Sequence, residues 1–335
     1  MKQHQKILTI SIAAYNMEKY LAKSLSSLVL ENAYIDDMEV LIINDGSTDN
    51  TAAVAEKYIQ KYPTVFRVIN KKNGGYGTAV NRGIQEARGK YFKLLDGDDW
   101  FDTNALRDLL RILRTEETDL IITDYVERYA SGKRIYKKIN CEYGKQCSMK
   151  HPFFALPMHA VCCRTHILKD NDIRLEKGLL YTDMEYVLYL LFYIKSISHY
   201  PIFLYQYRLG RKGQSVDRKN RCRHMDDEYK VYENLRSYYN SHTIDNGYEM
   251  TILYIIVSIY NTIVHMLLSF NPSRKIKKEL ITREEELKRE CPVVYLISAG
   301  MSAKVFLLRR SGYKLYYILS VYTHMINMIK DLVMR

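Results

Sequence analysis

Short apolar runs alternate with helical stretches over the first 125 residues of the chain. The runs are rich in Ile, Val and Leu, as is typical of strands covered on both faces; they are Ile7–Ala14, Glu39–Ile43, Phe66–Ile69, Tyr91–Leu95 and Leu120–Thr123. Helical patterns lie between them, over 20–28, from Asp49 or Asn50 to about Tyr62, and over Thr78–Ala87 with Gly89 as its C′ residue. This alternation predicts an α/β fold with a mostly parallel central sheet, helices on both faces, and a ligand crevice at the carboxyl ends of the strands.

Polar, turn-rich clusters follow the first four of these runs. In order they read "AYN" (Ala14–Asn16), "NDGSTDN" (Asn44–Asn50), "NKKNGGYG" (Asn70–Gly77) and "DGDDW" (Asp96–Trp100). Asp45 and Asp49 could serve only as turn and helix-cap residues, for which Asp is favoured in any case. Asn73–Gly77 form a glycine loop. It is not a dinucleotide-binding fingerprint, because Val80 occupies the third glycine position and the loop follows the third strand and not the first.

The carboxylates of the fourth cluster set a physical problem. Asp96, Asp98 and Asp99 would repel one another at the mouth of a parallel sheet unless they were protonated, solvated or neutralised by a cation. A solvated turn is one solution. The other is a divalent ion, since Mg²⁺ and Mn²⁺ take oxygen ligands and often leave positions for substrate phosphates. A nucleotide diphosphate would fit such a site.

The four clusters, in this order, resemble the inverting family-2 glycosyltransferases with a GT-A fold, over roughly residues 5–215. The resemblance implies a nucleotide-diphosphate-sugar donor, of the UDP-sugar type, and a Mn²⁺ or Mg²⁺ ion. It implies that Asp45 recognises the base, that Tyr15 lies near it, and that Asp96 reaches the ribose side. Asp98 would hold the metal, with Asp96 beside it. The donor-binding residues implied in this way are Ala14, Tyr15, Asp45, Asn73, Gly75, Asp96 and Gly97.

A candidate general base follows from the same resemblance. The acceptor hydroxyl is a weak nucleophile until its proton is being removed, and the family commonly presents the base in a Glu-Asp-x-x-aromatic element at a helix start. Here "LLYTDMEYVLYLL" has Thr182 in place of the Glu, with Asp183 and Tyr186 in register. We expect Asp183 to be the base and Glu185 to be the alternative. Asp183 could also do no more than favour the helix dipole.

A basic stretch follows this element. It carries seven cations and two glycines, which predicts a mobile loop; the cations are Arg208, Arg211, Lys212, Arg218, Lys219, Arg221 and Arg223. The resemblance, more loosely here, implies that Arg208 and Arg211 close over the diphosphate and stabilise the leaving group. A solvated basic surface is the alternative.

The net charge of +12 is unevenly distributed. Residues 1–130 hold 17 Lys+Arg against 19 Asp+Glu, whereas residues 131–335 hold 33 against 19. A basic second half could meet nucleic acid, an anionic membrane or phosphate-bearing substrates, but nucleic-acid motifs are absent from the sequence, so we expect no nucleic-acid partner. The six cysteines lack zinc or C-x-x-C spacing and are expected to be reduced. The N-terminus lacks a signal-peptide pattern, which predicts a cytoplasmic protein.

The last third of the chain is expected to be mainly helical. The segment Thr251–Phe270 is uncharged and long enough to span a bilayer. Its polar residues nevertheless share one helical stripe, which favours a helix packed in a bundle; they are Tyr254, Ser258, Asn261, Thr262, His265 and Ser269. Nearer the C-terminus, apolar and aromatic residues mix with Lys304, Arg309, Arg310 and Lys314. This composition suits a helix on an anionic membrane, or ordinary packing with a basic exterior.

We therefore expect a GT-A domain over residues 1–215, with a nucleotide-binding part (1–125) and an acceptor part (126–215), and a helical region over 216–335. The expected function is metal-dependent, inverting transfer of a sugar from a nucleotide-sugar donor to a hydroxyl of a glycan acceptor. The acceptor would be lipid-linked and the enzyme peripheral on the cytoplasmic face of the membrane, in bacterial-type surface-polysaccharide synthesis. A glycoside hydrolase and a non-catalytic nucleotide- or polysaccharide-binding module are the alternatives.

Overall fold

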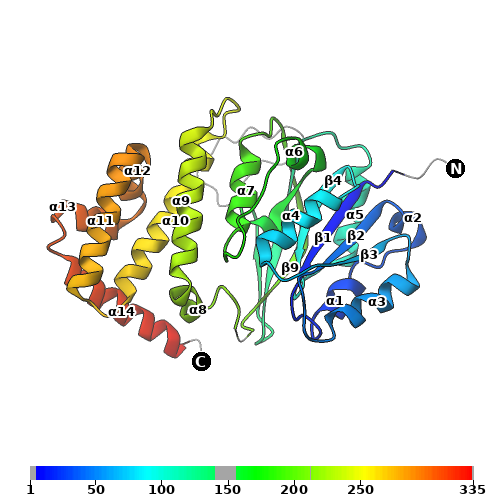
Figure 1. Ribbon diagram of the computed structural model, residues 1–335, viewed down its shortest axis with the longest axis horizontal. Coiled ribbons are helices and arrows are strands. Elements are labelled where there is room, and N and C mark those ends of the chain that lie inside the picture. Colours follow the sequence, from blue (N-terminus) through cyan, green and yellow to red (C-terminus); the bar gives the residue numbers. More distant parts are fainter. Residues whose placement is uncertain (1–4, 140–155, 212, 334–335) are drawn as a thin grey trace. The chain divides into compact units, whose positions relative to one another are not determined.

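The computed structural model of the protein describes residues 5–139, 156–211 and 213–333. The described residues form two compact units. The first comprises the chain up to Asp217 together with Ile244–Tyr248, and the second comprises the remainder. The sheet belongs to the first unit and a group of long helices to the second (Figure 1).

In the described part of the first unit, nine strands form one mixed sheet. The strand order is β3-β2-β1-β4-β8-β6-β9-β5, with β7 paired to β6. The strands are β1 Leu8–Ala14, β2 Met38–Asn44, β3 Phe66–Asn70, β4 Tyr91–Asp96, β5 Trp100–Phe101, β6 Leu120–Tyr129, β7 Arg134–Lys137, β8 Val161–Arg164 and β9 Ile197–Leu209. The β3-β2-β1-β4 and β6-β9 pairings are parallel, whereas β5, β7 and β8 pair antiparallel. The predicted α/β fold with a mostly parallel sheet is confirmed.

Helices lie on both faces of this sheet (Figure 1). They are α1 Leu21–Ser26, α2 Asn32–Ile35, α3 Thr51–Lys61, α4 Tyr76–Glu86, α5 Thr103–Leu113, the 3₁₀ helix η1 Met158–Ala160, α6 Thr165–Asp170 and α7 Asp183–Leu191. The chain moves outward from β1 to β3 and then returns to the other side of β1 to form β4. Because such crossovers are right-handed, the return places α4 on the opposite face from α1 and α3. The reversal between β1 and β4 opens a crevice at their carboxyl ends.

Gly89 has a different role from the one predicted. Helix α4 ends at Glu86 with Ala87 as its C-cap, so Gly89 is not its C′ residue. The Gly89 N–H donates to Thr9 Oγ1 (2.8 Å), and a Cβ at position 89 would lie 2.5 Å from the Thr9 backbone nitrogen. Glycine is required here because the chain passes close against β1.

The basic stretch predicted as a mobile loop is largely regular structure. Arg208 lies within β9, which continues to Leu209, and α8 (Arg218–Arg223) takes up the end of the stretch. Arg208 and Leu209 pair with β6, and the Arg208 backbone N–H also donates to Asp99 Oδ1 (2.7 Å). Lys212 lies outside the described residues. The loop prediction is therefore wrong for Arg208 and for residues 218–223.

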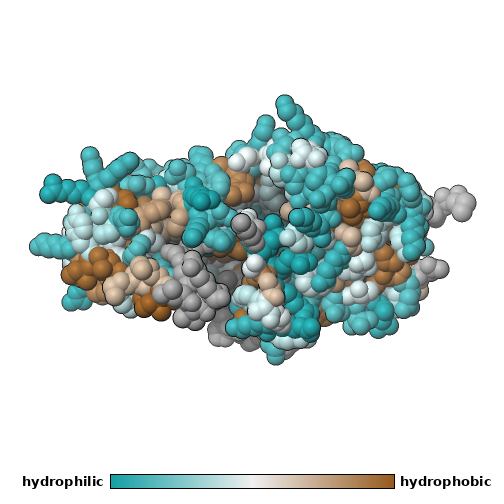
Figure 2. Space-filling view, turned by 90° about the horizontal axis from the view of Figure 1, so that it is seen from below, coloured by the Kyte–Doolittle hydropathy of each residue, from teal (hydrophilic) through white to brown (hydrophobic). Residues whose placement is uncertain are grey.

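The second unit is helical. It contains α8, α9 Met225–Ser241, α10 Glu249–Ser269, α11 Arg274–Glu290, α12 Pro292–Met301, α13 Ala303–Arg310 and α14 Tyr316–Val333. Helix α10 packs against α9, α12 and α14. From residue 251 onward its less buried positions are those of the predicted polar stripe. Among the described helices, α10 is long and apolar enough to cross a membrane, but it is mostly buried within the protein. Helices α12 and α13, which meet at a bend of 113°, also pass this test if they are counted as one helix. Hydrophobic side chains also gather at the surface over the C-terminal helices (Figure 2).

The described cysteines are free thiols, as predicted. Cys162, Cys163 and Cys291 are buried, and Cys222 is partly exposed. Cys141 and Cys147 lie outside the described residues. Burial raises the pKa of Cys162 to about 12, so this thiol is neutral and packs as a small apolar side chain.

Candidate active site

A cavity of about 540 Å³ opens at the carboxyl ends of β1, β2 and β4. Ten of the eleven residues predicted from the sequence line it; they are Ala14, Tyr15, Asp45, Asn73, Gly75, Asp96, Gly97, Asp98, Asp183 and Arg211. Arg208 is the predicted residue that is not in its wall. Turns that are far apart in sequence thus meet where the strand order reverses, as the fold requires.

The first two turns are held together by Asn16. Its backbone is left-handed (φ 54°), a conformation that Asn tolerates. Asn16 Oδ1 accepts from the Thr48 backbone N–H (2.9 Å), and the Asn16 N–H donates to Ser47 Oγ (3.0 Å). Asp49 precedes the N-cap Asn50 of α3, and its carboxylate accepts from the backbone N–H groups of Glu18 and Thr51. These bonds fix the backbone of Tyr15, whose exposed ring stands at the cavity wall.

The carboxylate of Asp45 holds the glycine loop in place. Although it lines the cavity, Asp45 is buried and accepts from the backbone N–H groups of Gly74 (3.0 Å) and Gly75 (2.8 Å). The same carboxylate forms an ion pair with Lys71, whose Nζ also donates to Thr78 Oγ1 (2.8 Å). Asp45 therefore shapes the loop at the start of α4, and its contact with a base stays a prediction.

The three carboxyl groups of the acidic turn after β4 have different environments, which limit their mutual repulsion in different ways. Asp98 Oδ2 accepts from Arg211 Nε (2.9 Å). Asp99 is buried and accepts from Tyr205 Oη (2.8 Å) as well as from the Arg208 backbone. Burial, together with the nearby charges of Asp98 and Asp183, raises the pKa of Asp96 to about 8. Burial and the charges of Asp98 and Asp96 also raise the pKa of Asp99, so Asp96 and Asp99 are the carboxyls that need a proton or a cation.

A possible metal site adds a histidine to this turn. Asp96, Asp99 and His159 each offer a ligand atom, and these atoms all lie within 4.8 Å of one another. His159 Nδ1 is buried without a hydrogen-bond partner among the described residues, and burial together with Lys93 lowers the pKa of its imidazole to about 3, which leaves it neutral. Carboxylate oxygens and neutral imidazole are both metal ligands, and carboxylates suit Mg²⁺ and Mn²⁺. These residues fit a divalent ion, whereas the predicted ligand Asp98 has Arg211 against its carboxylate.

His159 is positioned by a buried lysine and was not found from the sequence. Lys93, in the middle of β4, is fully buried and donates from Nζ to His159 O (3.0 Å) and Val161 O (3.1 Å). Burial lowers the pKa of this ammonium to about 8. The His159 ring packs against Tyr205 and Tyr207, with centroids 4.5 and 4.2 Å away. A lysine inside an apolar strand needs a buried polar partner. Lys93 within "YFKLL" was therefore the feature of the sequence that could have indicated a further polar segment at this site.

The two candidate bases, Asp183 and Glu185, differ in whether their side chains face the cavity. Asp183 is the first residue of α7 and lines the cavity. Glu185 is fully buried, is not in the cavity wall, and accepts from the Glu176 backbone N–H through Oε2 (2.7 Å). Of the two carboxylates, Asp183 is therefore the one that can reach a substrate bound in the cavity.

Helix α4 links the glycine loop to the segment that leads into α7. The Asn81 side chain makes two hydrogen bonds to the backbone of Leu175: Nδ2 donates to Leu175 O and Oδ1 accepts from the Leu175 N–H, both at 2.8 Å. The Gly178 N–H donates to Gly74 O (3.2 Å). Gly77 packs so closely here that a Cβ would lie 2.3 Å from Glu176 O. The glycine loop and the segment that leads to Asp183 are thereby held in fixed positions relative to each other.

The two predicted arginines have different positions. Arg211 lines the cavity and faces Asp98. Arg208 donates from Nε to Asp98 O (2.8 Å), and its guanidinium lies 4.9 and 5.0 Å from the ring centroids of Tyr20 and Trp100. In this conformation Arg208 braces the acidic turn, and Arg211 is the cation available to an anion in the cavity.

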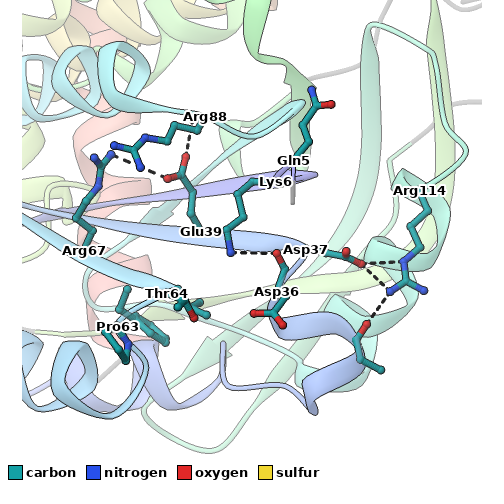
Figure 3. A pocket seen from close by; sticks show the side chains of 13 residues that line it. Gln5, Lys6, Asp36, Asp37, Glu39, Pro63, Thr64, Arg67, Arg88 and Arg114 are labelled. Carbon is teal, nitrogen blue, oxygen red and sulfur yellow. Dashed lines mark hydrogen bonds and ion pairs between the residues drawn. The ribbon is translucent and has the colours of Figure 1, made fainter. Parts of the chain in front are cut away.

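A larger hollow, of about 1200 Å³, lies at the opposite edge of the sheet, where β1, β2 and β3 begin (Figure 3). Its charged groups are largely satisfied by one another. Glu39 accepts from the Arg88 backbone N–H (2.5 Å), Asp37 pairs with Arg114 (2.7 Å), and Lys6 Nζ donates to Asp36 O (3.0 Å). Ligands bind at the carboxyl ends of parallel strands in such folds, so the smaller cavity is the candidate active site.

Comparison with known proteins finds similarity to glycosyltransferases. Residues 9–169 match the family model "Glycosyl transferase family 2". The putative glycosyltransferase EpsH of Bacillus subtilis is 36% identical over 140 residues, which cover 42% of this chain and 40% of EpsH. The chain thus spans less than half the length of this curated relative. Over residues 9–169, a little less than half of its length, the chain is therefore similar to glycosyl transferase family 2.

Solved structures agree on the fold. TarS of Staphylococcus aureus, a poly(ribitol-phosphate) beta-N-acetylglucosaminyltransferase, is 25% identical over 49% of this chain and 29% of its own length. A crystal structure of S. aureus TarS has a TM-score of 0.66 at 17% identity, covering 93% of this chain and 55% of that one. TarS 1–349 with UDP-GlcNAc (TM-score 0.54, 18% identity) covers 96% and 89%. The mannosyltransferase PcManGT from Pyrobaculum calidifontis, with GDP-Man and Mn²⁺ (0.54, 12%), covers 96% and 88%.

Proposed function

We propose that this protein is an inverting, metal-assisted glycosyltransferase that moves a sugar from a UDP-sugar to a hydroxyl of a glycan acceptor in cell-surface polysaccharide synthesis. The observation that carries the proposal is the cavity itself. It gathers a candidate base (Asp183), an acidic turn with a carboxyl in need of a cation (Asp96), and one arginine (Arg211) at the carboxyl edge of the sheet. The TarS complex with UDP-GlcNAc supports the donor class.

In the proposed reaction the acceptor oxygen attacks the anomeric carbon from the side opposite the diphosphate. The bond from that carbon to the diphosphate oxygen breaks in the same displacement, so the configuration inverts. Asp183 takes the proton from the attacking hydroxyl, which makes this oxygen a sufficient nucleophile. Arg211 exchanges Asp98 for the departing diphosphate and stabilises its charge.

Asp96, Asp99 and His159 would hold a divalent ion, with Asp98 as a further carboxylate once Arg211 has moved to the phosphates. Such an ion neutralises charge on a diphosphate leaving group. Around it, the protein keeps His159 neutral and fixes η1 through Lys93, so that the ligand geometry exists before substrate arrives. Asp45 and the glycine loop would bind the nucleoside portion.

The acceptor and the place of work complete the proposal. The excess of cations over residues 131–335 suits an enzyme that approaches an anionic membrane. We propose a lipid-linked glycan acceptor and a peripheral position on the cytoplasmic face. The acceptor-binding part, 126–215, includes residues 140–155, which lie outside the described residues.

The test is donor turnover by the purified full chain. UDP-GlcNAc, UDP-glucose, UDP-galactose and GDP-mannose are each incubated with the protein in Mn²⁺ or in EDTA, and binding and release of the nucleoside diphosphate are measured. We expect one UDP-sugar to bind and turn over in Mn²⁺ and to lose turnover in EDTA. Failure of all four donors to bind would reject the proposal. Cleavage of a glycan without any nucleotide sugar would instead indicate a hydrolase.

A further inference from the structure

Helix α14 of the second unit buries polar side chains and exposes apolar ones. Ser320 and Thr323 are fully buried, and Asn327 is nearly so. Against α10, Ser320 Oγ donates to Leu268 O (3.0 Å) and Asn327 Nδ2 donates to Ser269 Oγ (2.9 Å). A surface helix of a water-soluble protein has the opposite arrangement. The outward side of α14 is therefore suited to contact something other than water.

The outward side forms one apolar stripe, which we call the outer face. Its side chains are 48–66% exposed; they are Ile318, Val321, Tyr322, Met325, Met328 and Ile329. Spacings of three, four and seven residues place them along one side of a helix. The sequence from Tyr316 to Ile329 contains no Asp, Glu, Lys or Arg. Figure 2 shows hydrophobic side chains at the surface over the C-terminal helices.

A basic pocket adjoins α14. It has a volume of about 440 Å³ and is lined by Arg274, Lys277 and Lys278 of α11, with Glu285 and with Tyr317 of α14 among its other residues. Lys277 Nζ lies 5.7 Å from the centroid of the Tyr317 ring. Among the described residues, none of the three cations is in an ion pair. Cations in the first turns of a helix are unfavourable to its dipole, so helix stability does not explain them.

We propose that the outer face and the basic pocket dock on an anionic lipid bilayer. The outer face would enter the boundary between headgroups and acyl chains, and lipid phosphates would occupy the basic pocket. An apolar stripe flanked by cations, with Tyr at its edges, is the pattern of a helix lying in the plane of a membrane surface. The inference rests on the proposed function, whose acceptor is carried by a lipid, and names the surface that makes the contact.

Charge favours a bilayer over a second copy of the chain. A twofold dimer uses the same patch on both subunits, so it would bring two basic pockets to one interface. An anionic bilayer supplies the opposite charge, and each basic residue near it contributes about a fivefold gain in affinity. The outer face and the basic pocket are therefore complementary to one and the same surface.

Two of the four cations expected from the sequence, Lys304 and Arg309, are engaged within the second unit. Arg309 is held within the unit, because it pairs with buried Glu284 and its guanidinium lies 3.7 Å from the Tyr295 ring centroid. Lys304 Nζ is hydrogen-bonded to His265 Nδ1 (3.0 Å). Removal of the chain from Lys304 onward would also uncover the α10 residues that α14 covers. Point substitutions on the surface are the appropriate test.

The experiment measures co-sedimentation of the full chain with vesicles of phosphatidylglycerol mixed with phosphatidylcholine, and of phosphatidylcholine alone. Met325→Glu is compared with Met250→Glu. Met250 is also exposed, but it lies at the start of α10, about 27 Å along that helix from Leu268, which α14 contacts. Lys277→Glu is compared with Lys288→Glu, near the far end of the same helix α11. Donor turnover is measured in every variant, because it reports on the proposed function independently of lipid binding.

We expect salt-sensitive binding to the anionic vesicles, weakened about tenfold or more by Met325→Glu and by Lys277→Glu, with the two control variants and donor turnover unchanged. Absence of wild-type binding would overturn the inference, as would equal binding by all variants. If Met325→Glu converts a dimer into a monomer without changing vesicle binding, the outer face joins two copies and the inference is wrong. Donor turnover that persists in these cases leaves the proposed function standing.

Discussion

Replacement of Asp183 by Asn should remove most transfer activity while the protein remains folded. Asn keeps the shape of the side chain but cannot take the proton from the acceptor hydroxyl. Loss of a general base costs about 10²–10⁴ in rate, which is about 3–5 kcal/mol of transition-state stabilisation. The stability cost should be small, because a carboxylate in the first turn of α7 contributes about 0.3–1 kcal/mol through the helix dipole. The substitution also removes one charge that raises the pKa of Asp96.

Glu185→Gln is the matched control. It makes the same chemical change in the first turn of the same helix, but on a fully buried side chain outside the cavity wall. The amide oxygen can still accept from the Glu176 N–H, although the bond loses its charge assistance. We expect a loss of about 1–3 kcal/mol in the free energy of unfolding and near wild-type transfer by the folded protein.

The assay compares three proteins. Urea unfolding gives the stability of each, calorimetric titration gives the donor affinity, and release of nucleoside diphosphate in the presence of acceptor gives the rate. Asp183→Asn should lose rate without losing donor affinity, and Glu185→Gln should lose stability without losing rate. Wild-type rates from Asp183→Asn would refute the assignment, and so would an inactive but folded Glu185→Gln.

Three further predictions concern the cavity and its frame. The pKa of Asp96 is about 8 in the folded protein and ordinarily 3.8. Without metal, the folded protein therefore keeps a proton that the unfolded chain releases near pH 4, and the free energy of unfolding falls as pH rises from about 4 to 8. Asp96→Asn should therefore stabilise the metal-free protein at pH 8 by about 1 kcal/mol or more and abolish stabilisation by Mn²⁺ in thermal unfolding; an unchanged pH slope would contradict this. Asp45→Ala should weaken donor binding, measured by titration, more than it slows turnover, because its contacts persist through the reaction. Gly77→Ala, whose Cβ would lie 2.3 Å from Glu176 O, should lower the free energy of unfolding in urea by about 1–3 kcal/mol, whereas Gly300→Ala, with open space around it, should not.

The sequence by itself determined the strands β1 to β4 and β6, the helices α1, α3 and α4 between them, and ten of the residues that line the cavity. Strand runs and turn clusters are local patterns, since buried strands demand continuous apolar residues and turns demand Asn, Asp and Gly. In a doubly wound sheet the carboxyl ends of the strands must meet, so the positions of Ala14, Asp45, Gly75 and Asp96 followed from their place after each strand. Knowledge of contacts was not needed for this step.

Only the tertiary structure decided which side chains face the cavity. Asp183 and Glu185 are two residues apart, hence about 200° apart around a helix, and packing alone determines which of the two is buried. His159 entered the site because Lys93 of β4 needs buried carbonyl partners, a pairing across 66 positions that local patterns do not contain. The polarity of α14 likewise depends on which side packs against α10, because hydrophobic spacing identifies an amphipathic helix but not the direction its apolar stripe faces.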